Sequence, residues 1–225
     1  LATALAAVAA AAAAATPAVA ANEGLALKAG SEYLMVANYP NNLNVVDLAT
    51  SSVYKTCVLP DKFGPGLTQI SPDRRTAYIL GNRFGTIYGV DLDSCKLTFR
   101  AHMSLAPSER AKSIMSFTVS ADGKELYAVQ NPTTINRDHY RVGEPRFAVY
   151  DTAAGLNAKP ARVFPAPRQT NIMQAADDGS VYLAGPNIYK VDVKTGAMKT
   201  ALPIRDWERK TPAPLDVLYF WPVQT

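Results

Sequence analysis

The stretch "ISPDRRTAYILGNRFGTIYGVDLDSCKLTF", residues 70–99, is the most informative about the fold, because polar turns separate three alternating apolar runs within it. Valine, isoleucine, tyrosine and phenylalanine at a period of two suit the pleated surface of a sheet. Proline, aspartate, glycine and asparagine stand at the joints, where they favour tight turns. The stretch therefore predicts consecutive antiparallel strands.

A step from an apolar run through Val-Asp or Tyr-Asp into a polar turn recurs along the chain. It occurs in NLNVVDLATS at 42–51, TIYGVDLDS at 86–94, RFAVYDTAAG at 146–155 and IYKVDVKTG at 188–196. The aspartates are 44, 60 and 41 residues apart, close to the period of about 40–50 residues in a four-stranded propeller blade. A second marker is an aspartate turn before a tyrosine-bearing run, at 71–75, 120–124 and 176–180.

These markers divide the chain into units of four short strands. We expect strands at 66–71, 76–82, 86–93 and 96–103, then at 114–120, 125–131, 146–152 and 161–167, then at 170–176, 180–185, 188–194 and 197–204. The first unit lacks an innermost strand and offers 33–39, 42–49 and 53–60, whereas 214–225 predicts the inner strand of a fifth unit. Only residues 103–113 could hold a helical turn, which Pro107 limits.

The sequence thus predicts an all-β fold, with an incomplete β-propeller over residues 21–225. About four blades of four-stranded antiparallel sheet are expected, because radially stacked sheets bury both of their faces. A sandwich of two sheets is the alternative.

Residues 1–20 are uncharged and mostly alanine, and they end in Ala18-Val19-Ala20. This pattern is typical of a secretory signal peptide cleaved after Ala20. An alanine-rich helix of the mature protein and a membrane anchor are the alternatives. Because neither an initiator methionine nor a positive segment precedes the run, we expect a truncated signal peptide on an exported, periplasmic protein that has no membrane span after cleavage.

Charge and cysteine content bound the chemistry further. The 23 Lys and Arg residues exceed the 19 Asp and Glu residues by a net charge of +4, without a basic block that would indicate nucleic-acid binding. Cys57 and Cys95 are the only cysteines, and in an oxidising compartment they form a disulfide or stay as two half-buried thiols. Neither lies in a Cys-x-x-Cys or Cys-x-x-Cys-His pattern, so we expect no cofactor-binding or metal residues in this chain.

No convincing catalytic set is present, and we assign no catalytic residue. His102 and His139 lie 37 residues apart in different units, and each is better interpreted as a solvated or partner-facing side chain. The recurring aspartates are interpreted as turn residues that accept hydrogen bonds from backbone N–H groups, rather than as metal ligands.

The third unit is longer than the others because of one loop at 130–145. Loops that break the period of a repeat often carry recognition, so Arg137, His139 and Tyr140 are candidates for partner contacts. A solvated insert without a partner is the alternative. Arg168 and Gln169 precede the fourth unit and, if the strand order is right, face the mouth of the central channel. They complete the set of candidate interface residues.

Several segments together resemble the β subunit of bacterial quinohemoprotein amine dehydrogenase. From about Leu25 to Thr225 they are, in order and with similar spacing, YLMVANYPNNLNVVDL, VYKTCVLPDKFGPG, TAYILGNRFGTIYGVDLDSCK, FPAPRQ, ADDGS, IYKVDVKTG and DVLYFWP. The resemblance implies a seven-bladed propeller in a periplasmic αβγ heterotrimer that oxidises primary amines to aldehydes.

The same resemblance implies a division of labour among the subunits. A dihaem cytochrome c α subunit carries c-type haem and a small γ subunit carries cysteine tryptophylquinone, while the propeller is their docking platform. No catalytic residue is thereby assigned to this chain. The main alternative is a free-standing exported propeller that binds a ligand or a surface partner. A propeller enzyme such as a lactonase is a third possibility.

Overall fold

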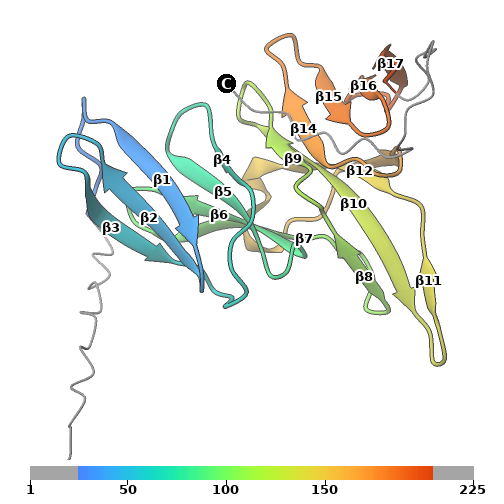
Figure 1. Cartoon of the computed structure of the whole chain (residues 1–225), viewed down its shortest axis with the longest axis horizontal. Helices are drawn as coiled ribbons and strands as arrows, with labels where there is room; N and C mark the ends of the chain where they lie inside the picture. The colour runs from blue at the N-terminus through green and yellow to red at the C-terminus, as the bar shows by residue number, and fades with distance from the viewer. Residues whose placement is uncertain (1–24, 205–225) are drawn as a thin grey trace, which may run out of the picture.

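The computed structural model describes residues 25–204 and contains four antiparallel sheets, which follow one another along the chain (Figure 1). We call these sheets blades 1 to 4. The expected signal peptide at 1–20 and the expected inner strand at 214–225 lie outside the described residues.

Blades 1 and 2 are simple meanders in which each strand pairs with the next. Blade 1 contains β1 (Tyr33–Asn38), β2 (Asn42–Asp47) and β3 (Ser52–Val58). Blade 2 contains β4 (Thr68–Ile70), β5 (Thr76–Gly81), β6 (Thr86–Asp91) and β7 (Leu97–His102). The three-stranded first blade and the four-stranded second blade were both predicted, and both are confirmed.

Blades 3 and 4 keep the same order of strands. Blade 3 contains β9 (Phe117–Val119), β10 (Glu125–Ile135), β12 (Arg146–Asp151) and β13 (Arg162–Pro165), to which β8 (Glu109–Lys112) and β11 (Tyr140–Val142) are added. Blade 4 contains β14 (Ile172–Ala175), β15 (Val181–Ala184), β16 (Ile188–Val191) and β17 (Met198–Leu202). Every strand expected between residues 33 and 204 is present.

The apolar cores lie between successive blades. In β12, Ala148 and Tyr150 pack into the core between blades 2 and 3, whereas Phe147 and Val149 pack into the core between blades 3 and 4. Because successive residues of a strand point to opposite faces, a strand with a blade on each side needs apolar residues at both odd and even positions. This requirement explains the nearly continuous apolar runs of the central strands.

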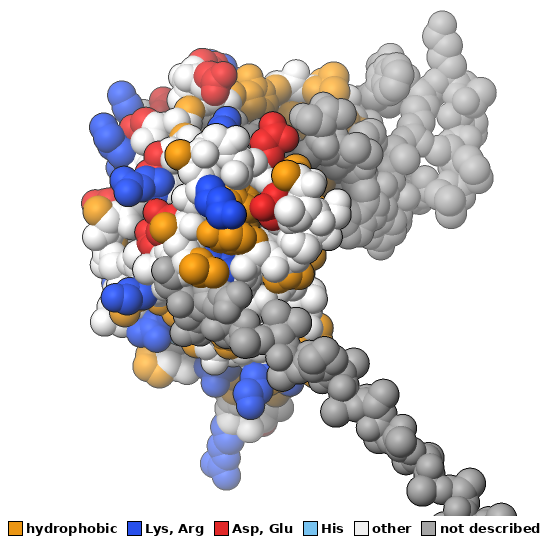
Figure 2. All heavy atoms as spheres, turned by 90° about the vertical axis from the view of Figure 1, so that its left-hand side faces the viewer, with side chains coloured by type: hydrophobic (Ala, Val, Ile, Leu, Met, Phe, Trp, Pro, Cys, Tyr) orange, Lys and Arg blue, Asp and Glu red, His pale blue; other side chains and the backbone are white. Residues whose placement is uncertain are grey.

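The outer face of blade 1 has no neighbouring blade among the described residues. Leu34 of β1 and Val53 of β3 are 52% and 46% exposed there. Figure 2 views the molecule from this side and shows hydrophobic side chains among charged side chains of both signs.

A disulfide and the hydrogen bonds of a buried lysine join blade 1 to blade 2. Cys57 and Cys95 form a disulfide with their Cα atoms 5.1 Å apart, so of the two alternatives the structure has the bonded pair. The ammonium group of the nearby Lys55, which is 1% exposed, donates hydrogen bonds to the carbonyl oxygens of Leu92 and, at 3.1 Å, Asp93. Burial lowers the pKa of Lys55 below its ordinary value, and the neighbouring carboxylates oppose this shift.

Two sequence expectations need correction in the structure. Residues 103–113 hold no helix, because Glu109–Lys112 pair as β8 with the end of β10. The helical turns instead lie at η1 (Thr152–Asn157), where the side chain of Asp151 accepts a hydrogen bond from the N–H of Ala153. The insertion at 130–145 is not a loop either, because a longer β10 and the added β11 form a hairpin there.

Candidate partner-binding edge

The antiparallel order gives each blade two different edges. Connections between first and second strands, and between third and fourth strands, lie at one edge, which we call the turn edge. Connections between second and third strands, and from each blade to the next, lie at the opposite edge, which we call the loop edge. All five candidate interface residues belong to connections at the loop edge.

Most connections at the turn edge are the same small hydrogen-bonded turns, whereas the longer connection between β12 and β13 holds η1. In blade 2, Oγ of Ser71 donates to Oδ1 of Asp73 at 2.5 Å, and in blade 3, Oγ of Ser120 donates to Oδ1 of Asp122 at 2.7 Å. The four spaced aspartates also accept bonds through Oδ1 from an N–H two or three residues later: Asp47, Asp91, Asp151 and Asp192. The prediction that these carboxylates organise turns is confirmed.

The loop edge is irregular and exposes large aromatic side chains. Tyr39 is 77% exposed, Phe63 52% and Tyr140 74%. The guanidinium group of Arg83 lies 4.0 Å from the centre of the Phe63 ring, which is a cation–π distance. At the turn edge, polar side chains satisfy backbone N–H groups. The loop edge instead exposes aromatic side chains that are not needed for this purpose.

The insertion forms a small sheet at the loop edge of blade 3. Residues 131–134 of β10 pair with β8, and residues 133–135 pair with β11. We call β8, β11 and residues 131–135 of β10 the extension. In Figure 1 it projects away from the four blades.

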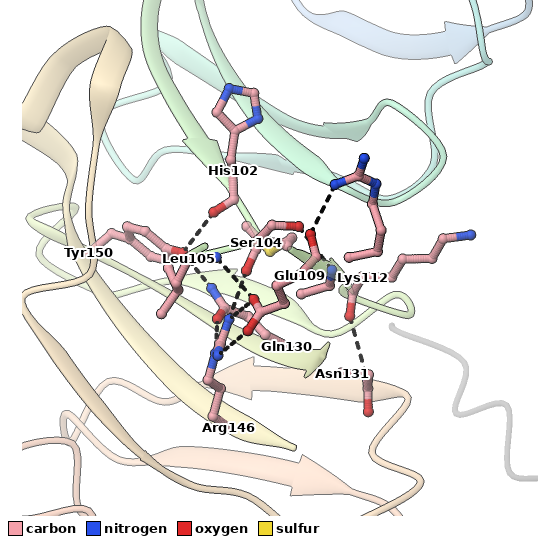
Figure 3. A network of polar contacts seen from close by, with 12 residues as sticks. His102, Ser104, Leu105, Glu109, Lys112, Gln130, Asn131, Arg146 and Tyr150 are labelled. Atoms are coloured by element: carbon pink, nitrogen blue, oxygen red, sulfur yellow. Dashed lines mark hydrogen bonds and ion pairs between the residues drawn. The ribbon is translucent and has the colours of Figure 1, made fainter. Parts of the chain in front are cut away.

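A mostly buried ion pair anchors the extension to the blade (Figure 3). The two ends of the Arg146 guanidinium bind the two carboxylate oxygens of Glu109 at 2.5 and 3.0 Å. The same guanidinium donates to the carbonyl of Met103 at 3.1 Å and to the side-chain oxygen of Gln130 at 2.6 Å. The Arg146 and Glu109 side chains are only 17% and 14% exposed, so the pair fixes β8 against β10 and β12.

This network continues into the core through hydrogen bonds between side chains. Gln130, which is fully buried, donates to the hydroxyl of Tyr150 at 2.5 Å. Burial raises the pKa of Tyr150 well above its usual range, so the phenol stays neutral. Burial also acts to raise the pKa of Glu109, but the bonds from Arg146 and from the Leu105 N–H hold it below its ordinary value. Glu109 is therefore a carboxylate at neutral pH.

The candidate residues of the insertion lie around the hairpin turn of the extension. Arg137 and His139 are exposed in the turn, where Nδ1 of His139 lies 2.7 Å from Oδ1 of Asp138. Tyr140 begins β11 and pairs with Ile135. The turn is thus organised by its own side chains and leaves Tyr140 open to solvent.

The other two candidates lie between β13 and β14, at the same edge. Arg168 and Gln169 are both exposed, and Gln169 has a positive φ of 62° in the turn that leads into β14. Arg168 donates to Glu144 at 2.5 Å, which links this connection to the segment that follows β11. The structure therefore joins Arg168 to the end of the insertion.

The two histidines lie in separate places. His102 is exposed, and its Nδ1 is 3.1 Å from Oγ1 of Thr86. Partial burial lowers the pKa of His102, and the positive charges of Arg100 and Lys159 lower it further. Within residues 25–204, no three His, Cys, Asp or Glu side chains gather as a metal-binding group, and no helix has the length and apolar character to cross a membrane.

Sequence reasoning missed the residues that anchor the extension. Gln130 ends the apolar run of β10, and Arg146 begins β12 on the other side of the insertion. A fully buried glutamine calls for a polar partner, and this was the available signal. Its partners Arg146 and Tyr150 are 16 and 20 residues away, so only the fold identifies them.

Comparison with known proteins supports the fold alone. No family model and no curated protein matches the chain. Among solved structures, the β-propeller domain of Cps50 (Swd1) from Myceliophteria thermophila is 12% identical with a TM-score of 0.52, covering 74% of this chain and 48% of that one. Hydrazine synthase of Kuenenia stuttgartiensis is 15% identical with a TM-score of 0.52, at coverages of 76% and 51%.

A third solved structure, U3-55K, is 10% identical with a TM-score of 0.56, and the match covers 74% of this chain and 47% of that one. The chain therefore spans about half the length of the structures that it matches. At such low identity the matches carry the architecture and no activity. With the four stacked sheets they favour the propeller over the sandwich, and the chain has an all-β, propeller-like fold.

Proposed function

We propose that this chain is the propeller subunit of a periplasmic quinohemoprotein amine dehydrogenase. In this role it holds a quinone-bearing small subunit and a dihaem cytochrome c subunit together for the oxidative deamination of primary amines. The sequence resemblance from about Leu25 to Thr225 supports the proposal, and so does the propeller-like fold. The extension at the loop edge is the observation that carries it.

The extension suits a scaffold because it is rigid at its base and exposed at its end. The buried contact between Arg146 and Glu109 fixes its position, while Tyr140 and the hairpin turn remain open to solvent. A preorganised contact surface loses less conformational entropy on binding than a flexible loop does. The arrangement therefore favours a docking role over a solvated insert.

In this role the chain contributes position and exclusion of water rather than proton transfer. The quinone on the partner subunit supplies the oxidising chemistry for the amine, and the haems accept the electrons. Blades that cover one side of the amine pocket would keep water out, which favours attack by the neutral amine and limits side reactions. The chain's own residues act here through contact with the partners.

Co-purification provides the first test. The chain should be purified from the periplasmic fraction together with a protein that shows haem absorption. The complex should reduce an electron acceptor when a primary amine is added. A chain that elutes alone, free of haem and of amine-dependent turnover, would instead be the free-standing ligand-binding propeller.

A variant pair then tests the extension within the complex. Replacing His139 and Tyr140 by alanine should reduce recovery of the assembled complex by about tenfold, since exposed aromatic residues commonly dominate interface energies. The matched control replaces Leu48 and Lys194, which are exposed in turns of the turn edge, and should leave recovery unchanged. Equal recovery of both variants, with equal amine turnover, would remove the extension from the proposal.

A further inference from the structure

The extension has two unlike faces, which its strand register defines. Paired residues of neighbouring antiparallel strands point to the same side, so Arg110, Thr133 and Val142 share one face. We call this the outer face, and alternation along the three strands completes it as Arg110, Lys112, Asn131, Thr133, Ile135, Tyr140 and Val142. The opposite, inner face includes Glu109, Thr134 and Arg141.

The inner face is occupied by the rest of the protein near its base. Ala111 is 3% exposed and belongs to the core between blades 2 and 3, and Glu109 is bound to Arg146. The outer face is different, because Val142 is 68% exposed and Tyr140 74%. Tyr140 and Val142 thus form an apolar strip on the outer face, which no segment among residues 25–204 covers.

Positive charges flank this strip. Arg110 and Lys112 are exposed on β8, and neither forms an ion pair with another part of residues 25–204. Glu109 is already paired with Arg146 on the inner side, and Asp138 lies beside His139 in the turn. The outer face therefore combines apolar area with cations that lack an acidic partner.

We infer that the outer face of the extension binds a protein surface with an apolar centre and carboxylates placed to meet Arg110 and Lys112. The inference rests on the proposed function, because it names the chemistry of the partner at the same edge. Complementary charges at such an interface set register and speed association, and Tyr140 and Val142 supply the area removed from water.

The distribution of residues favours a protein over an anionic membrane as the occupant. The apolar side chains lie along the flank of the extension, whereas its tip consists of the polar and charged residues 136–139. A hairpin that enters a bilayer needs apolar residues at the tip, because unpaired charges are costly in hydrocarbon. A flank suits a protein surface that packs side by side with it.

Carbodiimide coupling tests the acidic partner directly, because it joins an amine to a carboxylate in close contact. The full chain is treated in its periplasmic complex, and the cross-linked peptides are identified by mass spectrometry. We expect Lys112 to be joined to an Asp or Glu of the quinone- or haem-bearing subunit. Lys194, exposed in the turn between β16 and β17 at the turn edge, is the control amine and should remain uncoupled. Failure of Lys112 to couple to any partner carboxylate would overturn the inference.

A matched pair of charge reversals distinguishes the effect of the outer face from the effect of net charge. Arg110→Glu and Arg141→Glu make the same change on the same extension, but on its outer and inner faces respectively. The partner identified by cross-linking is then purified separately, and its affinity for each variant is measured at low salt. Arg110→Glu should weaken binding by about tenfold or more and Arg141→Glu by about twofold or less. Equal losses would attribute the effect to net charge and would contradict the assignment of the face.

The outcomes distinguish this inference from the proposed function. Coupling of Lys112 to a carboxylate of a protein without haem or quinone, with binding sensitive to Arg110→Glu, supports the outer face and overturns the amine dehydrogenase proposal. If the complex with the haem- and quinone-bearing subunits forms normally with Arg110→Glu, the amine dehydrogenase proposal is supported and the role of the outer face is overturned. Binding of the chain to phosphatidylcholine vesicles containing phosphatidylglycerol, lost in Arg110→Glu, would show a lipid occupant and overturn the protein partner.

Discussion

The turn edge and the loop edge are the two ends of the same strands, yet they are built differently. At the turn edge, Ser71 with Asp73 and Ser120 with Asp122 make matching bonds in different blades. At the loop edge, the corresponding connections range from a short turn at 82–85 to the extension of blade 3. The regular edge satisfies backbone groups, and the irregular edge exposes aromatic and cationic side chains.

This contrast indicates which connections of the fold can vary in length and sequence. Each turn must satisfy its backbone N–H groups within a few residues, which restricts the turn edge to a few residue types. A connection at the loop edge can lengthen at little entropic cost, because closure entropy grows only slowly with length. A long addition must still be held in place, and blade 3 achieves this with a buried ion pair.

Loss of the anchor should produce the largest effect. Replacing Arg146 by methionine leaves the Glu109 carboxylate without its guanidinium in a site where its side chain is 14% exposed. Breaking a buried pair from one side typically costs about 3–5 kcal/mol. Hydrogen exchange of the β10 and β11 amides, compared with denaturant unfolding of the whole chain, should show faster local opening of the extension.

Two controls define this prediction. Arg146→Met combined with Glu109→Gln removes both charges and should cost less than the single change. Arg168→Met breaks the exposed pair with Glu144, which is worth at most about 1 kcal/mol. If all three variants exchange alike, the anchor has no special role in holding the extension.

Removal of the disulfide should be the next largest effect. It fastens the turn that contains Cys95, at the turn edge of blade 2, to Cys57 of blade 1 across a sequence separation of 38 residues. In the chain-entropy model a cross-link of this span contributes about 3–4 kcal/mol. Urea unfolding with and without a reductant should show this loss, and the double variant Cys57→Ala, Cys95→Ala should not respond to the reductant.

Removing one hydrogen bond from either of two equivalent turns should lower the free energy of unfolding by a smaller amount, which should be the same for both turns. Ser71→Ala removes an acceptor for the N–H of Thr76, and Ser120→Ala removes one for the N–H of Glu125. Each loss of a hydrogen bond should cost about 1 kcal/mol, without any change in partner binding. Denaturant unfolding measures both values. Clearly unequal costs would show that the blades do not use these turns equivalently.

Acid should produce the smallest and most local effect. Since the pKa of Glu109 is lowered in the folded chain, its ion pair stabilises the extension fully above the ordinary glutamate value of about 4.3. This contribution is lost as the pH falls through the lower, folded pKa. The difference in β10 exchange between the wild-type chain and Glu109→Gln should therefore shrink with acidification. A difference that does not depend on pH would contradict the assignment.

Much of the fold could be predicted because its signals are local. Alternating apolar residues and turn-forming aspartates located every strand between 33 and 204 except β8 and β11, since side-chain parity and turn chemistry depend on near neighbours. The extension could not be predicted in this way. Residues 130–145 are polar enough for a loop, and their strand character depends on pairing with Glu109–Lys112.

The candidate site was predictable only in part, for a related reason. Composition and the longer spacing of the third unit pointed to Arg137, His139 and Tyr140, but neither indicates which side of a strand is covered. The division into an inner and an outer face depends on where Arg146 and the core between blades 2 and 3 hold the extension.

The repeating strands and the turns that end them follow from the amino-acid order alone, because they depend on residues a few positions apart. The pairing of β8 with β10, the Arg146–Glu109 contact across 37 residues and the exposed face shared by Arg110 and Tyr140 arise only in the folded chain. Those features depend on free energies of packing between segments distant in the chain, which no local pattern encodes.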